Sequence, residues 1–271
     1  MAIVDATLLR GLIAKWTYRS GWHGELKVTT HDICLPAGTP LHAPLAVAFA
    51  SDFHAGPTTH PEVFLSVARE LQEHRPDVLL MGGDFVSGKT ANIAPLLNAL
   101  SKYDPPLGKF AVLGNHDLWA GGEEIARQLS ECGVEVLVNR NVPLAFPYDG
   151  VSICGIDDPW TGLADSAKAF ENSKPVRIWL THSPDGILAL GDHKYTIGFA
   201  GHTHGGQICL PDGTPIVTAG GPLCRSHSRG LFDIRGNGPL IVSRGVGCSN
   251  LPVRINSDPE LIICQLHSSA A

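Results

Sequence analysis

Residues 45–54 of this chain read LAVAFASDFH, an apolar run that leads directly into Asp52 and His54. A short continuous apolar run that ends in polar residues is typical of a strand buried on both faces. Four further runs of this kind follow, and each ends at residues able to bind a metal ion. They are DVLLMG (77–82) before Asp84, KFAVL (109–113) before Asn115 and His116, RIWLT (177–181) before His182, and TIGFA (196–200) before His202 and His204.

The segments between these runs have the periodicity of helices. Residues 61–74 (PEVFLSVARELQEH) repeat apolar residues every three or four positions, and Pro61 suits the first turn of a helix. Residues 123–132 (EEIARQLSEC) predict a second helix, which ends at Gly133. In the last third of the chain, strands with little helix between them are predicted at GQICL (206–210), GLFDI (230–234), PLIVSR (239–244) and LIICQL (261–266). We therefore expect an α/β fold with a mixed sheet.

Size and composition favour one domain that spans residues 1–271. The chain is 44% hydrophobic and 17% charged, which is enough to bury a sizeable core. Its formal charge of −6 argues against a broad nucleic-acid surface, although a single nucleotide-like substrate stays open. Seven cysteines without a Cys-x-x-Cys pair predict buried free thiols in a reducing compartment. Because there is neither a secretory signal nor an apolar stretch of roughly 20 residues, the expected location is the cytoplasm.

We expect the residues that follow the five strands to meet. In open α/β sheets, ligands bind beyond the carboxyl ends of the strands, so positions far apart in sequence become neighbours. The glycines before Asp84, Asn115 and His202 would let the backbone turn sharply. Alternation in an extended backbone would also put the two ligands of each His-x-His or Asp-x-His pair on a common side. The predicted cluster contains Asp52, His54, Asp84, Asn115, His182, His202 and His204.

The donors of this cluster predict a pair of divalent metal ions. Two carboxylates, one amide oxygen and four imidazoles suit manganese, iron or zinc better than calcium or magnesium. Manganese is the first candidate, with iron and zinc as alternatives. Two such ions, the two carboxylates and a bridging hydroxide would together leave a charge of about +1, which matches a phosphate.

The order of the motifs adds a resemblance to a known family. Asp-x-His (52–54), Gly-Asp (83–84), Gly-Asn-His-Asp (114–117), a lone histidine after a strand (182) and Gly-His-x-His (201–204) resemble the calcineurin-like metallophosphoesterase superfamily. Shorter segments, among them SDFHAG, GIDDPW, HSPD, GHTHGGQ and LPVRINSDPE, are similar to its bacterial YkuE/YaeI-like branch and extend the likeness to residues 27–266. Relatives of that branch include a hydrolase of lipid A synthesis that cleaves UDP-2,3-diacylglucosamine.

This resemblance implies a fold and an assignment of ligands. The fold is a sandwich of two mixed β-sheets flanked by helices. The implied ligands are Asp52, His54 and His204 for one metal ion, Asn115, His182 and His202 for the other, and Asp84 as the bridge between them.

The expected reaction uses the hydroxide between the two ions as its nucleophile. His116 adjoins the ligand Asn115 but is not needed to complete the coordination. We therefore count it, with the bridging Asp84, among the catalytic residues, where it would stabilise the transition state or protonate the leaving oxygen. Asp117 would support the ligands from behind.

Four more residues are candidates for contact with the substrate. Arg225 and Arg229 follow the last metal motif and could bind a phosphate, with ordinary surface charge as the alternative. Trp119 and Trp160 could form an apolar wall for a leaving group, with core packing as the alternative.

Three functions follow from these expectations. The leading hypothesis is a metal-dependent phosphoric ester hydrolase that acts on phosphodiester or pyrophosphate bonds of a small or lipid-linked molecule. The second is hydrolysis of UDP-2,3-diacylglucosamine, which would need an apolar groove beside the metals for the acyl chains. The third, from a different class, is a non-catalytic metal-binding scaffold. Neither a nucleic-acid polymer nor an obligate protein partner is expected.

The first 26 residues predict an amphipathic helical extension. Leu8, Leu9, Leu12, Ile13 and Trp16 fall on one helical face, with Arg10, Lys15 and Arg19 elsewhere. Such a helix could lie in a membrane interface, so that residues 1–20 contact the inner face of the membrane. The alternative is a helix docked on the protein's own surface.

Overall fold

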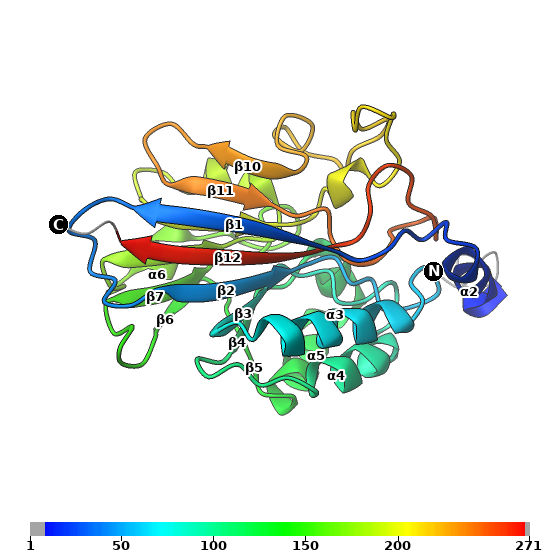
Figure 1. Cartoon of the computed structure of the whole chain (residues 1–271), viewed down its shortest axis with the longest axis horizontal. Helices are drawn as coiled ribbons and strands as arrows, with labels where there is room; N and C mark the ends of the chain where they lie inside the picture. The colour runs from blue at the N-terminus through cyan, green and yellow to red at the C-terminus, as the bar shows by residue number, and fades with distance from the viewer. Residues whose placement is uncertain (1–8, 269–271) are drawn as a thin grey trace.

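Two six-stranded sheets form the centre of the molecule (Figure 1), and the structure, a computed structural model, describes residues 9–268. The first sheet has the order β1 (Lys27–Leu35), β12 (Glu260–Ser268), β2 (Leu45–Ala50), β3 (Val78–Met81), β4 (Lys109–Ala111) and β5 (Val134–Val136). The second has the order β10 (Gly230–Asp233), β11 (Pro239–Val242), β9 (Ile197–Ala200), β8 (Val176–Leu180), β7 (Val151–Gly155) and β6 (Arg140–Pro143).

Both sheets are mixed, which confirms the predicted fold class. In the first sheet, β2, β3, β4 and β5 run parallel, whereas β12 pairs antiparallel with β2. In the second, β7, β8, β9 and β11 run parallel, and the edge strands β6 and β10 pair antiparallel. The parallel strands of each sheet therefore all end at the same edge.

Side chains of the central strands alternate between two cores. In β2, Val47 and Phe49 pack between the sheets, where Phe49 lies 5.3 Å from Phe199 of β9, measured between ring centroids. Ala48 and Ala50 of the same strand face the helices on the outer side. Because both faces are covered, the strand sequence is apolar throughout rather than alternating.

Helices cover the outer faces of the sandwich. Figure 1 shows α3 (Glu62–His74), α4 (Ala94–Leu100) and α5 (Asn115–Glu131) gathered on the first sheet, with the short 3-10 helix η2 (Thr90–Ile93) leading into α4. On the second sheet lie α6 (Ser166–Phe170) and the 3-10 helix η3 (Pro184–Ala189). The predicted helix over residues 61–74 is confirmed, and it follows Pro61 as expected.

The second predicted helix begins earlier than its apolar periodicity indicates. It starts at Asn115 rather than near residue 123, and it bends at Gly121, whose φ is +127°. Asp117 explains the early start, because its carboxylate accepts a hydrogen bond from the backbone N–H of Gly114 and so caps the helix. The Gly-Asn-His-Asp motif is thus the beginning of a helix and not only the end of a strand.

The five predicted strands that precede the motifs are confirmed to within two residues, but one later prediction is wrong. Residues 206–210 form no strand, because the 3-10 helix η4 (His204–Gly206) ends there in two glycines with positive φ, and only isolated bridges at Ile208 and Cys209 follow. Four strands were not predicted, namely β1, β5, β6 and β7. Three of these, β1, β5 and β6, lie at sheet edges, where polar residues interrupt the apolar pattern.

The N-terminal segment forms a helix, but its apolar face points outward. After the 3-10 turn η1 (Leu9–Gly11), helix α2 (Leu12–Arg19) buries the small side chains of Ala14 and Thr17. Leu12 and Trp16 are 62% and 63% exposed. Leu8 lies outside the described residues, as does the side chain of Leu9. Among residues 9–268, no helix is both long and apolar enough to cross a bilayer.

Candidate metal centre

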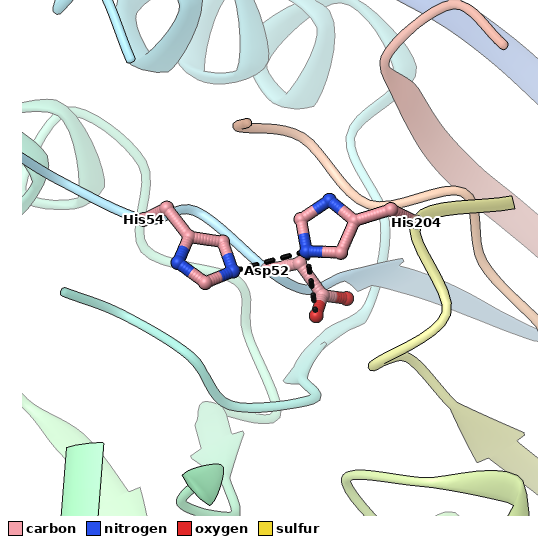
Figure 2. Close-up of side chains that lie close together, drawn as sticks. All are labelled: Asp52, His54 and His204. Atoms are coloured by element: carbon pink, nitrogen blue, oxygen red, sulfur yellow. Dashed lines mark hydrogen bonds and ion pairs between the residues drawn. The ribbon is translucent and has the colours of Figure 1, made fainter. Parts of the chain in front are cut away.

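The side chains predicted to form a cluster do meet beyond the ends of β2, β3, β8 and β9. On one side, Nε2 of His54 lies 3.0 Å from Nε2 of His204, and the latter lies 3.6 Å from Oδ1 of Asp52 (Figure 2). On the other, Nε2 of His182 lies 3.1 Å from Nδ1 of His202 and 3.1 Å from Oδ1 of Asn115.

Asp84 lies between these two groups. Its Oδ2 atom is 3.4 Å from Nε2 of His54 and 3.5 Å from Nε2 of His182. The donor atoms of Asp52, His54 and His204 would hold one ion, and those of Asp84, His182 and His202 a second. A third group, His54, Asp84 and His116, overlaps the first two, and Asp84 contacts donors of both sides.

The backbone that presents these ligands is left-handed rather than extended. The φ angles of Asp52, His54, Asp84, His202 and His204 are all positive, from +45° to +70°. The expectation that strand alternation brings Asp52 next to His54 is therefore wrong, since each of these residues sits in a tight turn. Such conformations cost about 1–3 kcal/mol each for residues with a side chain and persist where the surrounding structure enforces them.

Two of the motif glycines are required for close approach rather than for turning. A Cβ atom on Gly114 would lie 2.3 Å from Oδ1 of Asp84, and one on Gly201 would lie 2.4 Å from Oδ2 of Asp52. Of the three glycines before Asp84, Asn115 and His202, only Gly83 has a positive φ. The carboxylates of Asp84 and Asp52 thus pack directly against bare backbone of neighbouring loops.

Hydrogen bonds behind the histidines fix which ring nitrogen faces the cluster. Nδ1 of His182 lies 2.7 Å from the carbonyl oxygen of Gly82, and Nε2 of His202 lies 3.1 Å from that of Gly220. A carbonyl only accepts, so both outer nitrogens carry a proton; the inner nitrogen of the neutral His202 presents a lone pair, and that of His182 does so once the ring gives up its second proton. Sequence reasoning identified neither these carbonyls nor Ser87, whose hydroxyl lies 3.0 Å from Nδ1 of His54.

Three atoms that could bind a metal ion therefore converge at one point. The inner nitrogens of His182 and His202 and the oxygen of Asn115 face one another at 3.1 Å beside the carboxylate of Asp84. Burial raises the pKa of Asp84 well above its usual value and lowers the pKa of His202 to about 3. Burial also acts to lower the pKa of His182, but the carboxylates of Asp84 and Asp52 outweigh it and raise this pKa to about 9. The cluster therefore attracts positive charge at the point where these donors meet, and a divalent cation could take the place of the proton on His182, so the residues present fit divalent metal ions.

Asp117 holds two of the loops that carry the candidate ligands. Its Oδ1 accepts hydrogen bonds from the backbone N–H groups of Phe85 (2.8 Å) and Val86 (3.2 Å), and its Oδ2 accepts from Gly114 (3.0 Å). One carboxylate therefore ties the segment after β3 to the segment after β4. Burial raises the pKa of Asp117 to about 6, although these amide donors act to lower it.

His116 lies at the edge of the cluster and faces the cavity. Its backbone N–H donates to Oδ1 of Asp84 (2.9 Å), and its ring packs 4.7 Å from the ring of His54 and 5.0 Å from that of Trp119. A ring nitrogen of His116 also lies within 4.8 Å of donor atoms of His54 and Asp84, close enough to join a metal site. Burial, with a smaller contribution from His182, lowers the pKa of His116 to about 4, so the imidazole is neutral at pH 7.

Comparison with known proteins decides the family. Residues 45–206, more than half of the chain, match the model of the calcineurin-like phosphoesterases. The chain belongs to this family. The phosphodiesterase YaeI of Escherichia coli (strain K12) is 31% identical, over 83% of this chain and 83% of its own length. A UDP-2,3-diacylglucosamine pyrophosphatase, LpxG of Chlamydia muridarum, is 30% identical, over 88% of each. The structure of TT1561 of Thermus thermophilus shares the fold alone, with a TM-score of 0.50, 11% identity and coverage of 75% and 91%.

As a calcineurin-like phosphoesterase of the predicted YkuE/YaeI-like branch, the chain is a metal-dependent phosphoric ester hydrolase. Its cluster opens into a cavity of about 530 Å³. Trp119 and Trp160 line this cavity and are 59% and 51% exposed, so both belong to its wall rather than to the core. Other apolar lining residues are Ile208, Ile216, Val217, Ala219 and Leu251.

The two predicted phosphate-binding arginines lie elsewhere in this phosphoesterase. Neither Arg225 nor Arg229 is among the described residues that line the cavity. The guanidinium of Arg229 donates instead to the carbonyls of Gly213 and Asn256 and so ties two loops together.

A third arginine, which sequence reasoning missed, lies beside the cluster. Arg254 is buried, and its Nη2 atom lies 3.3 Å from Nδ1 of His204. Its other donors bind the carbonyls of Gly247 and Ser257. The segment LPVRINSDPE, which marks the branch, is the signal that could have found it.

Proposed function

We propose that this chain hydrolyses phosphodiester or pyrophosphate bonds at a dinuclear metal centre. The two ions would be held by Asp52, His54, Asp84, Asn115, His182, His202 and His204. The observation that carries the proposal is the convergence of Nε2 of His182, Nδ1 of His202 and Oδ1 of Asn115 beside the buried carboxylate of Asp84. Manganese is the first candidate metal, and iron and zinc are alternatives.

When bound, the two ions would supply a deprotonated water as nucleophile, together with positive charge for the phosphoryl oxygens. The chain's own residues would orient the reaction around them. Asp84 would fix the spacing of the two sites from its position between His54 and His182. His116 faces the cavity as a neutral imidazole, so at pH 7 its role would be to donate a hydrogen bond to the transition state rather than to act as a strong acid.

The first test compares aryl phosphate monoesters and diesters as substrates of the purified chain. The metal is removed by chelation, and manganese, zinc or magnesium is then added back. Hydrolysis of the diester that returns with metal would support the proposal. Stoichiometric metal without turnover on a broad panel of diesters and nucleotides would instead point to the non-catalytic scaffold.

A second candidate substrate is a diacylated nucleotide sugar. The apolar wall beside the predicted metal sites favours it, because Trp119, Trp160 and Val217 could accept an acyl chain. The relative LpxG, which is named as a UDP-2,3-diacylglucosamine pyrophosphatase, also supports this substrate. Measuring turnover of UDP-2,3-diacylglucosamine against its deacylated form tests this idea, since equal rates for the two would argue against a role of the wall in acyl recognition.

We also propose peripheral contact with the inner face of the membrane through residues 1–20 of an otherwise cytoplasmic, single-domain protein. The outward face of α2 combines the exposed Leu12 and Trp16 with the exposed cations Lys15 and Arg19. Such a face suits the interface of an anionic bilayer. Cosedimentation with phosphatidylglycerol vesicles should weaken in the Leu12→Ser/Trp16→Ser variant, whereas Phe146→Ser, at an exposed site away from α2, should bind as the unchanged chain does.

A further inference from the structure

Asp185 is a buried carboxylate that has no role in the reaction proposed above. It lies three residues after His182, in η3, and it is only 5% exposed. Its position is close to the cluster, yet it belongs to none of the three groups of candidate metal donors among the described residues. Its two oxygens are directed instead at two different segments.

One of these segments carries the wall of the cavity. The indole Nε1–H of Trp160 donates to Oδ2 of Asp185 at 2.9 Å. Trp160 is half exposed and comes from the loop after β7, so little of its ring is held by core packing. A hydrogen bond to a buried carboxylate is stronger than one between neutral groups, so it can hold the ring in one orientation.

The other segment is the loop of residues 219–224. The backbone N–H of Leu223 donates to Oδ1 of Asp185 at 2.8 Å. The carboxylate also packs directly on this loop, because a Cβ atom on Gly221, whose φ is +141°, would lie 2.1 Å from Oδ2. This is the loop whose Gly220 carbonyl accepts the hydrogen bond from His202.

The two segments also touch each other. A Cβ atom on Gly220 would lie 3.4 Å from the Cη2 atom of Trp160, which is an ordinary packing distance, and the indole lies 6.3 Å from the ring of His202. Asp185 therefore joins the wall, the loop and, through Gly220, the predicted ligand His202. Removing its charge would loosen all three without deleting a metal donor.

We propose that Asp185 is a positioning residue: it holds the indole of Trp160 against the loop of residues 219–224 and so fixes the wall on which the leaving group of the substrate binds. This inference rests on the proposed phosphoesterase function. It concerns the wall and not the chemistry, so it predicts an effect on substrate binding rather than on the rate of the chemical step.

Asp185→Asn tests the proposal with almost no change in shape. An amide has one acceptor oxygen, so the substituted side chain can accept from Trp160 or from Leu223 but presents a donor to the other. With saturating manganese and bis(4-nitrophenyl) phosphate, KM should rise about three- to tenfold while kcat stays within about twofold. Trp160→Phe, which keeps an aromatic ring but removes the N–H, should give a similar rise.

The double variant and a control separate positioning from general destabilisation. Because Asp185→Asn weakens the bond that Trp160→Phe removes, their effects on KM should not multiply when combined. Asp77→Asn is the matched control, since Asp77 also accepts a backbone N–H, that of Ala46, but lies at the start of β3, far from the site. Its KM should be unchanged. An unchanged KM in Asp185→Asn, multiplicative effects, or a joint loss of kcat and stability would overturn the proposal.

A readout without turnover keeps this test independent of the proposed function. The difference in tryptophan fluorescence between a chain with Trp160 and the same chain carrying Trp160→Phe gives the contribution of Trp160. In Asp185→Asn that component should be quenched more strongly by acrylamide, because an indole held only by a weaker bond, or by none, spends more time in solvent. Equal quenching in Asp185→Asn and the unchanged chain would reject the positioning role, even if no substrate is ever hydrolysed. Stronger quenching in Asp185→Asn, in a protein that hydrolyses no phosphate ester, would count only against the proposed reaction.

Discussion

The imidazole of His116 differs from the other histidines of the site in what surrounds it. His54, His182 and His202 each have one nitrogen fixed by a hydrogen bond behind the cluster. His116 faces the cavity and Trp119 instead. This contrast separates residues that would hold metal from one that would meet the substrate.

His116→Ala should therefore keep both metal ions and lose most of its turnover. A general acid or hydrogen-bond donor contributes about 10²–10⁴-fold, so a loss of this size is expected in kcat. Asp84→Ala should lose metal as well, because it removes the carboxylate shared by both sites. Metal content measured by mass spectrometry, together with kcat, tests the pair; a His116→Ala variant with unchanged turnover would remove His116 from the mechanism.

The pH dependence of kcat distinguishes the two candidate roles of His116, hydrogen-bond donor and general acid. The pKa of His116 is lowered to about 4, so the ring is charged only below that pH and stays neutral between about pH 6 and pH 8. The ratio of kcat between the unchanged chain and His116→Gln should then stay constant over this range. A ratio that declines as the pH rises would show that a protonated His116 acts as an acid.

The sequence was sufficient to predict which polar side chains gather at the strand ends, because each follows a buried apolar strand. It was not sufficient to predict the backbone conformation of these residues. Nothing in the residues Asp52, His54 or His204 marks a left-handed conformation, which is set by the loops around them. Arg254 and Gly220 were missed for a related reason: one is brought to the site by the fold, and the other contributes only a carbonyl.

Among the elements, the start of α5 links stability to the site. Asp117 caps this helix and at the same time accepts hydrogen bonds from the amides of Phe85 and Val86, next to the proposed ligand Asp84. The apolar periodicity of residues 123–132 could not reveal this first turn, since it contains the proposed ligand Asn115 and few apolar residues.

Asp117→Asn should weaken both the fold and metal binding. One amide oxygen cannot accept from both sides, so at least one buried backbone N–H would lose its partner, at a cost of about 1–3 kcal/mol in the free energy of unfolding. Loss of such outer support typically lowers metal affinity by about 10–100-fold. Denaturant unfolding and metal titration measure the two effects. Asp165→Asn is the control, because Asp165 caps α6 and asparagine is an equally good cap.

For the whole molecule, stability depends on the layer between the two sheets. Phe49 and Phe199 meet there from different sheets. The apolar strand sequences predict burial of this kind, but the pairing of β12 between β1 and β2 joins residues more than two hundred positions apart and has no local signal.

Phe49→Ala should destabilise the chain by about 3–5 kcal/mol, since it leaves a cavity between the sheets that cannot collapse without moving both. Phe146→Ala removes the same side chain where it is 85% exposed, and should change the free energy of unfolding by no more than about 0.5 kcal/mol. Urea denaturation of the two variants provides the comparison, and equal midpoints would contradict a shared core.

The left-handed turns at five of the proposed ligands should affect how long the protein survives degradation in a cell. At about 1–3 kcal/mol for each turn, the strain is comparable with the net stability of a whole domain. A chain deprived of metal would retain this strain with nothing to offset it, and it would open more often to proteases. The abundance of the protein should then follow the supply of its metal, which a pulse–chase experiment under manganese starvation would measure.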